Sequence, residues 1–254
     1  MTTHLSLLAP STTQSRLAER MLLHHVPIQR TSWQSTAAPS PAYELKNVLL
    51  EFSVPDSLCQ WQKLCQPDLP WAEDHFQERV SGIPHNPPPS SAWWPWYSDK
   101  ERAKFQHGQA KKFDHTYPER YWPRAAACAE DGYLRNKKTG DLNDVAKLLR
   151  KDIWTRQAYL PVWFPEDTGA LNGQRVPCSL GYHFLRNGPQ LDCSYFIRSC
   201  DLTRHYKNDL YLTGRLLQWM VEQVQASDGF PFPGTLTVFI SNLHLFVQDA
   251  WRFQ

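Results

Sequence analysis

The sequence predicts an α+β fold in which a mixed or antiparallel sheet is packed by helices. Residues 140–152 (GDLNDVAKLLRKD) combine an Asp-Leu-Asn start with apolar residues at helical spacing, which predicts a capped amphipathic helix. From residue 157 the period changes, and segments rich in alternating β-branched and aromatic residues are divided by glycine turns. A long apolar helix and a last strand follow. This succession of helices, strands, helix and strand is typical of the α+β class.

The elements before residue 125 are predicted in the same way. Residues 4–25 carry Leu and Met at helical spacing and are expected to form a helix. Residues 43–52 (YELKNVLLEF) are expected to form a buried helix that ends near Pro55. Residues 82–124 are rich in Pro and aromatic residues, so we expect an irregular insertion or loop there.

The strands are expected in 157–164, 176–188, 190–201 and 234–249, and the long helix in 208–225. With 254 residues, of which 41% are hydrophobic, residues 1–254 suffice for a single domain with a sizeable core. We detect no internal repeat in the sequence.

Composition excludes several classes of function. The formal net charge is +2 and no run of five Lys or Arg residues occurs, so binding to nucleic acid is not expected. No stretch of 18 apolar residues occurs, so no membrane span is expected. The N-terminal residues do not resemble a signal peptide, which predicts a cytoplasmic protein with reduced thiols. None of the six cysteines forms a C-x-x-C pair, so no metal site is predicted.

Four segments, in order, resemble thymidylate synthase. They are YELKNVLLEF (43–52), DLNDVAKLLRKDIWTRQAYLPVWFPED (141–167), RVPCSLGYHFLRNGPQLDCSYFIRSCD (175–201) and SNLHLFVQD (241–249). The Pro-Cys pair followed by the Arg-Ser-Cys-Asp sequence is the specific part. The resemblance implies the synthase-like fold, a homodimer with shared active sites, a pyrimidine nucleoside monophosphate as substrate and 5,10-methylenetetrahydrofolate as the one-carbon donor.

The resemblance assigns the nucleophile to Cys178. A thiolate that adds to C6 of a pyrimidine turns C5 into a carbanion able to attack a one-carbon donor. Arg198 is the expected neighbour, and a cysteine beside an arginine has a lowered pKa. An isolated cysteine of this kind is more often a buried structural thiol. The ordered set of motifs favours the catalytic interpretation.

The resemblance also implies the residues that bind the nucleotide. Arg198 and Ser199 would hold the phosphate, since a planar guanidinium matches it well. Arg156 matches an arginine that the family donates from the partner subunit, and Arg30 is a weaker match for a further one. His244 would hold a sugar hydroxyl, although a histidine on a strand more often packs in a core.

Two carboxylates receive roles from the same resemblance. Glu51 would act as general acid–base through water, because a carboxylate on an apolar helix face needs a task or a partner. Its alternative is a solvent-facing charge at a helix end. Asp201 resembles the family's folate contact, and its alternative is a satisfied carboxylate in a strand-end turn.

Asp209 occupies the position at which thymidylate synthases carry an asparagine that reads the uracil edge. Cytosine reverses the donor and acceptor pattern of uracil, and an Asp carboxyl can accept from the 4-amino group. This exchange resembles the (deoxy)cytidylate 5-hydroxymethylases, in which water quenches the methylene intermediate. The alternative is a helix N-cap at Asp209, with Asn208 as the other candidate for that position.

Some positions depart from the family pattern. Phe246 replaces a tyrosine that binds the sugar, and Ser179 replaces the histidine after the nucleophile. Residues 205–208 (HYKN) replace a Gly-Leu-Pro-Phe sequence. These departures leave the choice between CMP and dCMP open, and the detail of folate enclosure with it.

Alternative functions also stay open at this point. They are methylation of (d)CMP or dUMP with hydride transfer, and a catalytically inactive nucleotide- or RNA-binding homologue. Residues 90–124, with Trp93, Trp94 and Trp96, are expected to line the cavity that decides between water and hydride, or else to be a packing cluster. Tyr117 or Tyr121 is the candidate proton-handling tyrosine.

Overall fold

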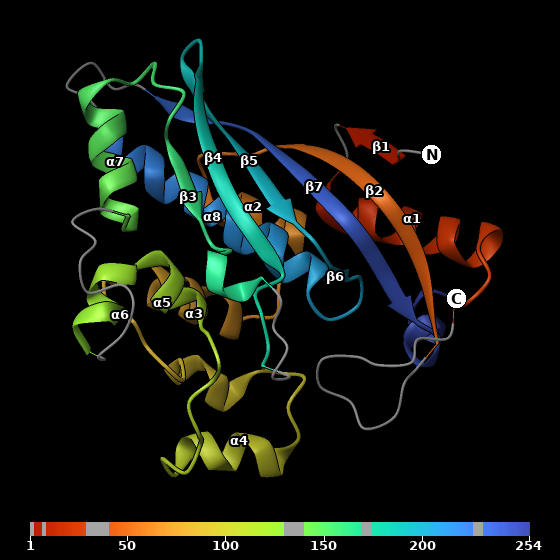
Figure 1. The fold of residues 1–254 in the computed structure, drawn as a ribbon. Coiled ribbons are helices and arrows are strands. Elements are labelled where there is room, and N and C mark those ends of the chain that lie inside the picture. Colours follow the sequence, from red (N-terminus) through yellow and green to blue (C-terminus); the bar gives the residue numbers. More distant parts are fainter. Residues whose placement is uncertain (1–2, 7–8, 29–40, 130–139, 169–173, 226–230) are drawn as a thin grey trace.

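A mixed seven-stranded sheet forms the centre of the protein (Figure 1). The computed structural model describes residues 3–6, 9–28, 41–129, 140–168, 174–225 and 231–254. The strands are β1 (Thr3–Ser6), β2 (Ala42–Ser53), β3 (Tyr159–Pro161), β4 (Ser179–Asn187), β5 (Gln190–Ile197), β6 (Cys200–Asp201) and β7 (Phe232–Phe246).

This sheet contains both parallel and antiparallel pairs of strands. Its order is β1-β2-β7-β5-β4-β3, and β6 continues the line of β5 along β7. β7 pairs antiparallel with β2 and parallel with β5, while β4 is antiparallel to both β5 and β3. The prediction of a mixed sheet packed by helices is therefore confirmed.

Helices cover one face of the sheet (Figure 1). The helices of the described residues are α1 (Pro10–His24), α2 (Leu58–Cys65), α3 (Trp71–Val80), α4 (Asp99–Gln106), α5 (Tyr117–Tyr121), α6 (Pro123–Ala129), α7 (Leu142–Lys151) and α8 (Tyr206–Val224), with 3-10 helices η1 (Pro89–Trp93), η2 (Pro165–Asp167) and η3 (Val247–Phe253). Of these, α4 lies apart from the sheet and contacts η1 (Figure 1). α8 contacts α1, α2, α3 and α7 as well as β5 and β7. Most of its side chains are buried, so it is the central helix of the core.

A glycine allows α2 and α8 to approach closely. A Cβ atom on Gly214 of α8 would lie 2.3 Å from the indole of Trp61 on α2. The indole N–H of Trp61 donates to the carbonyl of Tyr211 (3.1 Å), and Trp61 is fully buried. Only a residue without a side chain fits at position 214, because the large indole occupies that space.

The helix predicted for residues 43–52 was wrong, since these residues lie in β2. Val48, Leu50 and Phe52 are buried, while Leu49 and Glu51 alternate with them on the other face. The segment is rich in residues that favour helices locally. Pairing with β7 over its whole length overrides that preference, because strand formation depends chiefly on long-range packing.

Two further predictions before residue 125 were correct only in part. Residues 3–6 form β1 instead of the start of the first helix, and α1 begins at Pro10. Residues 82–124 contain the short helices η1, α4 and α5 between irregular segments. The helix at 140–152 is confirmed as α7, and the later strands and long helix are confirmed as β3, β4, β5, β7 and α8.

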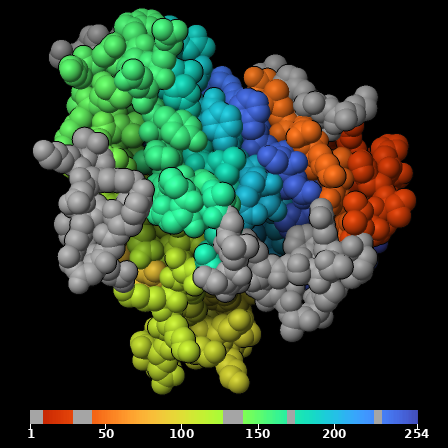
Figure 2. Space-filling model, viewed as in Figure 1, coloured from red at the N-terminus to blue at the C-terminus, as the bar shows by residue number. Residues whose placement is uncertain are grey.

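The other face of the sheet forms part of the surface (Figure 2). Phe239 on β7 is 40% exposed and stacks on Phe196 of β5 with a centroid separation of 5.1 Å. Tyr159 on β3 is 41% exposed on the neighbouring part of the sheet. Aromatic side chains that stay accessible on an open sheet face are typical of a face that another surface covers.

Candidate active site

Cys178 lies directly before β4, at the end of the sheet where β5 stops. Its side chain is half-buried, and its carbonyl accepts a hydrogen bond from the Arg198 N–H (2.9 Å). The predicted nucleophile, Cys178, and the predicted phosphate-binding segment that begins at Arg198 are therefore neighbours in the structure.

The electrostatic environment of Cys178 differs from the expectation. Burial raises the pKa of the thiol, Arg198 and Arg175 lower it, and Asp209 raises it. The net effect is a raised pKa, so the prediction of a lowered pKa was wrong. Desolvation outweighs the two guanidinium charges, and the thiol form is favoured in the unliganded protein.

Arg198 holds the backbone beside the thiol. Its Nε–H donates to the carbonyl of Pro177 (2.8 Å), and its Nη2 donates to the carbonyl of Val176 (3.1 Å). Its guanidinium also lies 5.6 Å from the ring centre of Trp163. Ser199, which follows it, is half-buried. The guanidinium thus holds the backbone of the residues that lead into β4. Its contact with a phosphate stays a prediction.

A hydrogen-bonded chain of hydroxyls begins next to Cys178. The hydroxyl of Ser179 lies 3.0 Å from that of Tyr117 and 2.6 Å from that of Tyr195. Burial raises the pKa of Tyr117, and the charges of Cys178 and Asp209 raise it further. Tyr117 therefore shares its surroundings with both predicted site residues, and among the two tyrosine candidates it is the one that contacts Ser179.

Asp209 lies in the first turn of α8, one helical turn beyond the N-cap. The N-cap is His205, whose carbonyl accepts from the Asp209 N–H (2.7 Å). The N-cap interpretation of Asp209 was therefore wrong. Asn208 is not the cap either, because its Oδ1 accepts from the backbone N–H of Asp68 (2.9 Å).

Opposing charges act on Asp209. Burial raises the pKa of its carboxyl, His205 and Arg79 lower it, and Asp201 raises it. The thiol of Cys200 donates to Oδ2 over 3.9 Å. Since Asp209 also acts on the pKa of Cys178, its carboxylate and the candidate nucleophile face a common region.

An aromatic stack borders this region. The ring of Trp94 stacks on His205 with a centroid separation of 5.6 Å, and Trp71 lies 4.0 Å behind Trp94. His205 retains exposed surface, yet burial lowers its pKa.

Asp201 and His244 face each other across β6 and β7. Oδ1 of Asp201 accepts from the backbone N–H groups of Thr203 (2.8 Å) and Arg204 (3.1 Å). This is the geometry of a satisfied turn carboxylate, the alternative considered for Asp201. His244 is the register partner of Asp201 on β7, is buried, and packs edge-on against Phe246. A folate contact and a sugar contact stay predictions.

Glu51 does not join the cluster. Glu51 of β2 pairs with Thr237 of β7. Ser179 of β4 pairs with Ile197 of β5, which pairs with Ile240 of β7. The two residues are therefore three strands apart across the sheet and three residues apart along β7. With strands about 4.8 Å apart and a rise of about 3.4 Å per residue, Glu51 lies on the order of 18 Å from Ser179. Its predicted catalytic role depended on a helix that does not form, so we do not propose it.

Two further arginines, Arg156 and Arg30, were predicted to bind the phosphate. Arg156 is exposed immediately before β3, and its carbonyl lies 3.1 Å from Nε2 of His183. Arg30 lies outside the described residues. A role for Arg156 in a partner's site agrees with its exposure and is taken up below.

Sequence reasoning missed Arg79, which the structure adds to the cluster. Arg79 is 4% exposed, near the end of α3, and its guanidinium lies 4.0 Å from the centre of the Tyr117 ring. The helical spacing of Arg79 from His75 and Phe76, which are also buried, is the signal that places it on the inner face of α3.

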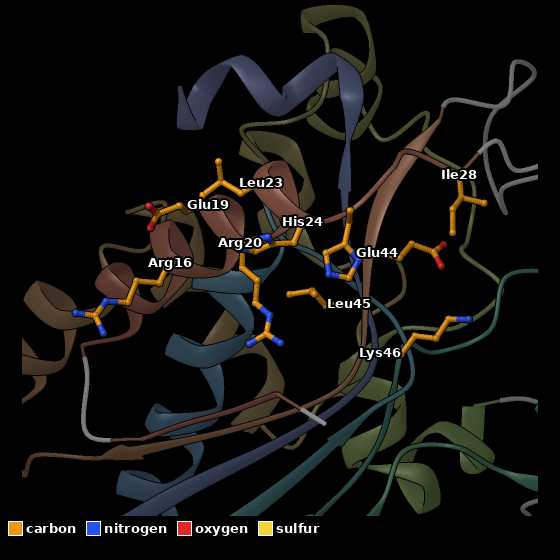
Figure 3. Close-up of a pocket in the computed structure, with 10 residues that line it drawn as sticks. Arg16, Glu19, Arg20, Leu23, His24, Ile28, Glu44, Leu45 and Lys46 are labelled. Atoms are coloured by element: carbon orange, nitrogen blue, oxygen red, sulfur yellow. The ribbon is translucent and has the colours of Figure 1, made fainter. Parts of the chain in front are cut away.

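A cavity of about 780 Å³ lies elsewhere, between α1 and β2 (Figure 3). Its lining includes Arg16, Arg20, His24 and Lys46, and it includes none of the predicted site residues. Within the described part of the chain, no group of three His, Cys, Asp or Glu side chains is arranged to hold a metal ion. The helices described there are also too short or too polar to span a bilayer.

Comparison with known proteins identifies the family of the chain. The family model described as thymidylate synthase matches residues 89–252, which is well over half of the chain and includes β3 to β7. A search of curated proteins found no match.

Proposed function

Because the chain belongs to the thymidylate synthase family, we propose that it transfers a one-carbon unit from 5,10-methylenetetrahydrofolate to C5 of a cytidine monophosphate. The family is one of transferases that act on pyrimidine nucleotides with a folate cofactor. In the proposed reaction CMP or dCMP becomes the 5-hydroxymethyl nucleotide, through a covalent adduct between Cys178 and C6.

The observation that carries the choice of base is the position of Asp209. Its carboxylate lies in the first turn of α8, and its charge acts on Cys178, Tyr117 and Cys200. A carboxylate accepts hydrogen bonds, so it suits the 4-amino group of cytosine better than the O4 atom of uracil. The alternative capping role is excluded by the position of His205 as N-cap.

The remaining residues divide the work of binding in this proposal. Arg198 and Ser199 hold the phosphate, His244 holds the sugar, and Asp201 contacts the folate. Arg198 would exchange its present acceptors, which are backbone carbonyls, for phosphate oxygens. That exchange is favourable because a guanidinium pairs with phosphate through charge-assisted hydrogen bonds.

The raised pKa of Cys178 determines how the reaction must begin. The thiol has to lose its proton before or while sulfur adds to C6, since the thiolate is the nucleophile. The hydroxyl chain from Tyr117 through Ser179 to Tyr195 lies next to it and supplies proton-handling groups. We assign this role to Tyr117, whose surroundings include both Cys178 and Asp209.

The active enzyme is proposed to be a two-fold dimer. The open face of the sheet, with Phe196, Phe239 and Tyr159, is the proposed interface. Arg156 is exposed beside that face and would reach the nucleotide phosphate of the partner's site, and Arg30 would supply a further phosphate contact. A self-complementary sheet face is the kind of surface that a two-fold axis duplicates.

One assay tests the proposed function. The protein is incubated with isotopically labelled 5,10-methylenetetrahydrofolate and, separately, with CMP, dCMP, UMP or dUMP, and the nucleotide is analysed by mass spectrometry. We expect a labelled hydroxymethyl group on a cytosine nucleotide, with the folate released as tetrahydrofolate. A labelled methyl group with dihydrofolate would mean hydride transfer instead.

Cys178→Ser is the matched control for this assay. A hydroxyl is a far weaker nucleophile than a thiolate, so transfer should vanish while nucleotide binding remains. If the wild-type protein binds nucleotides and labels none of the four, it is an inactive homologue and the proposal fails.

A further inference from the structure

Arg79 is a buried cation without a carboxylate partner among the described residues. Its side chain is 4% exposed, and no ion pair within 4 Å connects it to an Asp or Glu of the described part. Its Nε–H has no hydrogen-bond acceptor there either. Burial of an unpaired charge is unfavourable unless the charge has a task or gains a partner from a ligand.

The neighbours of Arg79 place it within the candidate active site. Its guanidinium lies over the ring of Tyr117, whose hydroxyl contacts Ser179, the residue after Cys178. Tyr121 and Tyr182 also interact electrostatically with Arg79. These phenols are neutral, because burial raises their pKa values, so they leave the charge of Arg79 uncompensated.

The backbone of Arg79 is fixed in this position. Its carbonyl accepts a hydrogen bond from the indole N–H of Trp122 (2.8 Å), which is itself buried. A cation in the last turn of a helix is also favoured by the helix dipole. The side chain therefore extends from a fixed backbone position over the ring of Tyr117.

Asp209 and Arg79 are complementary in charge and in hydrogen-bonding type. Burial raises the pKa of the Asp209 carboxyl, and the charge of Arg79 acts against that rise. When ionised, the carboxylate offers acceptors alone. The edge of cytosine presents a donor, the 4-amino group, and an acceptor, N3. Asp209 satisfies the first of these atoms, and a guanidinium N–H can satisfy the second.

We propose that Arg79 is a catalytic residue that donates a hydrogen bond to N3 of the cytosine ring while Asp209 accepts from the 4-amino group. The inference rests on the proposed function and assigns a role to a residue that lies before the matched region, residues 89–252.

The step that Arg79 stabilises is the first addition. The sulfur of Cys178 forms a bond to C6, and the C5=C6 π pair moves onto C5 and, through C4, onto N3. No atom leaves. Arg79 keeps its proton and stabilises the negative charge on N3. The pair on C5 then bonds to the one-carbon unit, or takes a proton from water, which exchanges the C5 hydrogen with solvent.

Solvent exchange of the C5 hydrogen isolates this step, because it needs no folate. Exchange on CMP and dCMP is measured for the wild-type protein, Arg79→Gln and Arg79→Lys, together with the thermal midpoint of each variant. We expect Arg79→Gln to lose roughly 100-fold in exchange rate, as when a donor to developing negative charge is removed. Arg79→Lys keeps the charge but not the planar fork, so we expect a loss of about tenfold.

Arg215→Met is the matched control. Arg215 also lies over an aromatic ring, that of Phe76 (4.6 Å), and is largely buried, but it pairs with Glu73. The same loss of a stacked guanidinium should lower the thermal midpoint and leave the exchange rate per folded molecule within about threefold of wild type.

The outcomes separate this inference from the proposed function. If wild type exchanges the C5 hydrogen and folded Arg79→Gln exchanges it within about threefold of that rate, Arg79 is a packing residue and the inference is overturned. If Arg79→Gln does not fold, an unchanged exchange rate in Arg79→Lys overturns it. If wild type exchanges none of CMP, dCMP, UMP or dUMP, the proposed function falls, and the role of Arg79 falls with it.

Discussion

The thiol of Cys200 has two acceptors within reach, Oδ2 of Asp209 at 3.9 Å and the carbonyl of Asp201 at 3.8 Å. Cys200 is buried at the start of the connection to α8. Sγ of Cys200 contacts Oδ2 of Asp209, whereas Oδ1 accepts no hydrogen bond from the described residues. This orientation suits a side chain that reads a ligand, since one oxygen is held by the protein and the other is available.

Replacement of this carboxylate should change the preferred base. Asp209→Asn should lose efficiency on cytosine nucleotides and gain it on uracil nucleotides. A mismatched buried polar pair costs about 1–3 kcal/mol, so the preference should shift by roughly tenfold to several hundredfold. The measurement is kcat/KM for CMP, dCMP, UMP and dUMP, with Asp99→Asn, an exposed carboxylate, as the control. Unchanged preference would show that Asp209 does not read the base.

The alkylation of Cys178 should follow an unusually high pKa. Because burial raises the pKa of this thiol, the thiolate appears only as the pH rises above the range of ordinary cysteines, which is about 8.5. The rate of iodoacetamide labelling of the Cys178 peptide, followed by mass spectrometry across pH, measures it. A midpoint at or below that of an unstructured cysteine peptide contradicts the expectation.

Two substitutions should move that midpoint in opposite directions. Arg198 lowers the pKa of Cys178, so Arg198→Met should shift the labelling midpoint to higher pH. Asp209 raises the same pKa, so Asp209→Asn should shift the midpoint to lower pH. Shifts of the same sign would mean that the substitutions act through altered burial and not through charge.

The contact between α2 and α8 should be sensitive to a single methyl group. Gly214→Ala places a Cβ where the Trp61 indole lies, and such overpacking costs about 1–3 kcal/mol of unfolding free energy. Denaturant unfolding measures it. Trp61→Phe in the Gly214→Ala background should reduce the penalty, because the smaller ring frees space. An additive double mutant would argue against this contact as the cause.

A charge on the open sheet face should separate the proposed dimer. Phe239→Asp puts a carboxylate at the stack with Phe196, so we expect a monomer in sedimentation experiments and loss of transfer activity. Leu23→Asp, at an exposed leucine of α1, is the control. A dimeric Phe239→Asp protein would place the interface elsewhere.

Mixed dimers test the partner role of Arg156. Arg156→Met and Cys178→Ser are each expected to be inactive alone. If Arg156 serves the partner's site, random mixing restores activity at about one quarter of all sites, since half of the dimers are mixed and each has one intact site. No recovery on mixing would mean that Arg156 acts in its own subunit or not at all.

The local sequence pattern was sufficient to predict an element where neighbouring residues along the chain determine its conformation. The charged start and apolar stripe of residues 140–152 predicted α7 correctly, and the alternating segments after residue 157 predicted the strands. It failed at β2, whose leucines and Glu51 favour a helix locally, because the pairing with β7 is contributed by residues about 190 positions away.

The site shows the same division. The motif around Cys178 and Arg198 was sufficient to identify two neighbours, since both lie at one end of adjacent strands. The raised pKa of Cys178 was not predictable, because burial depends on the whole fold. Arg79 was missed for a similar reason: its importance comes from Tyr117 and Asp209, which meet it only through the packing of α3, α5 and α8.

The contact between Asn208 and Asp68 affects the position of Asp209 more than the stability of the fold. Two hydrogen bonds of 2.9 Å tie Asn208, the neighbour of Asp209, to Asp68 in the loop before α3, and Lys207 also pairs with Asp68. Helix ends open more easily than helix centres. Replacement of Asp68 would remove the contacts of its carboxylate with Asn208 and Lys207, whereas the hydrogen bond from the backbone N–H of residue 68 does not depend on that side chain. Natural selection on product fidelity would then act on a loop residue outside the cluster around Cys178.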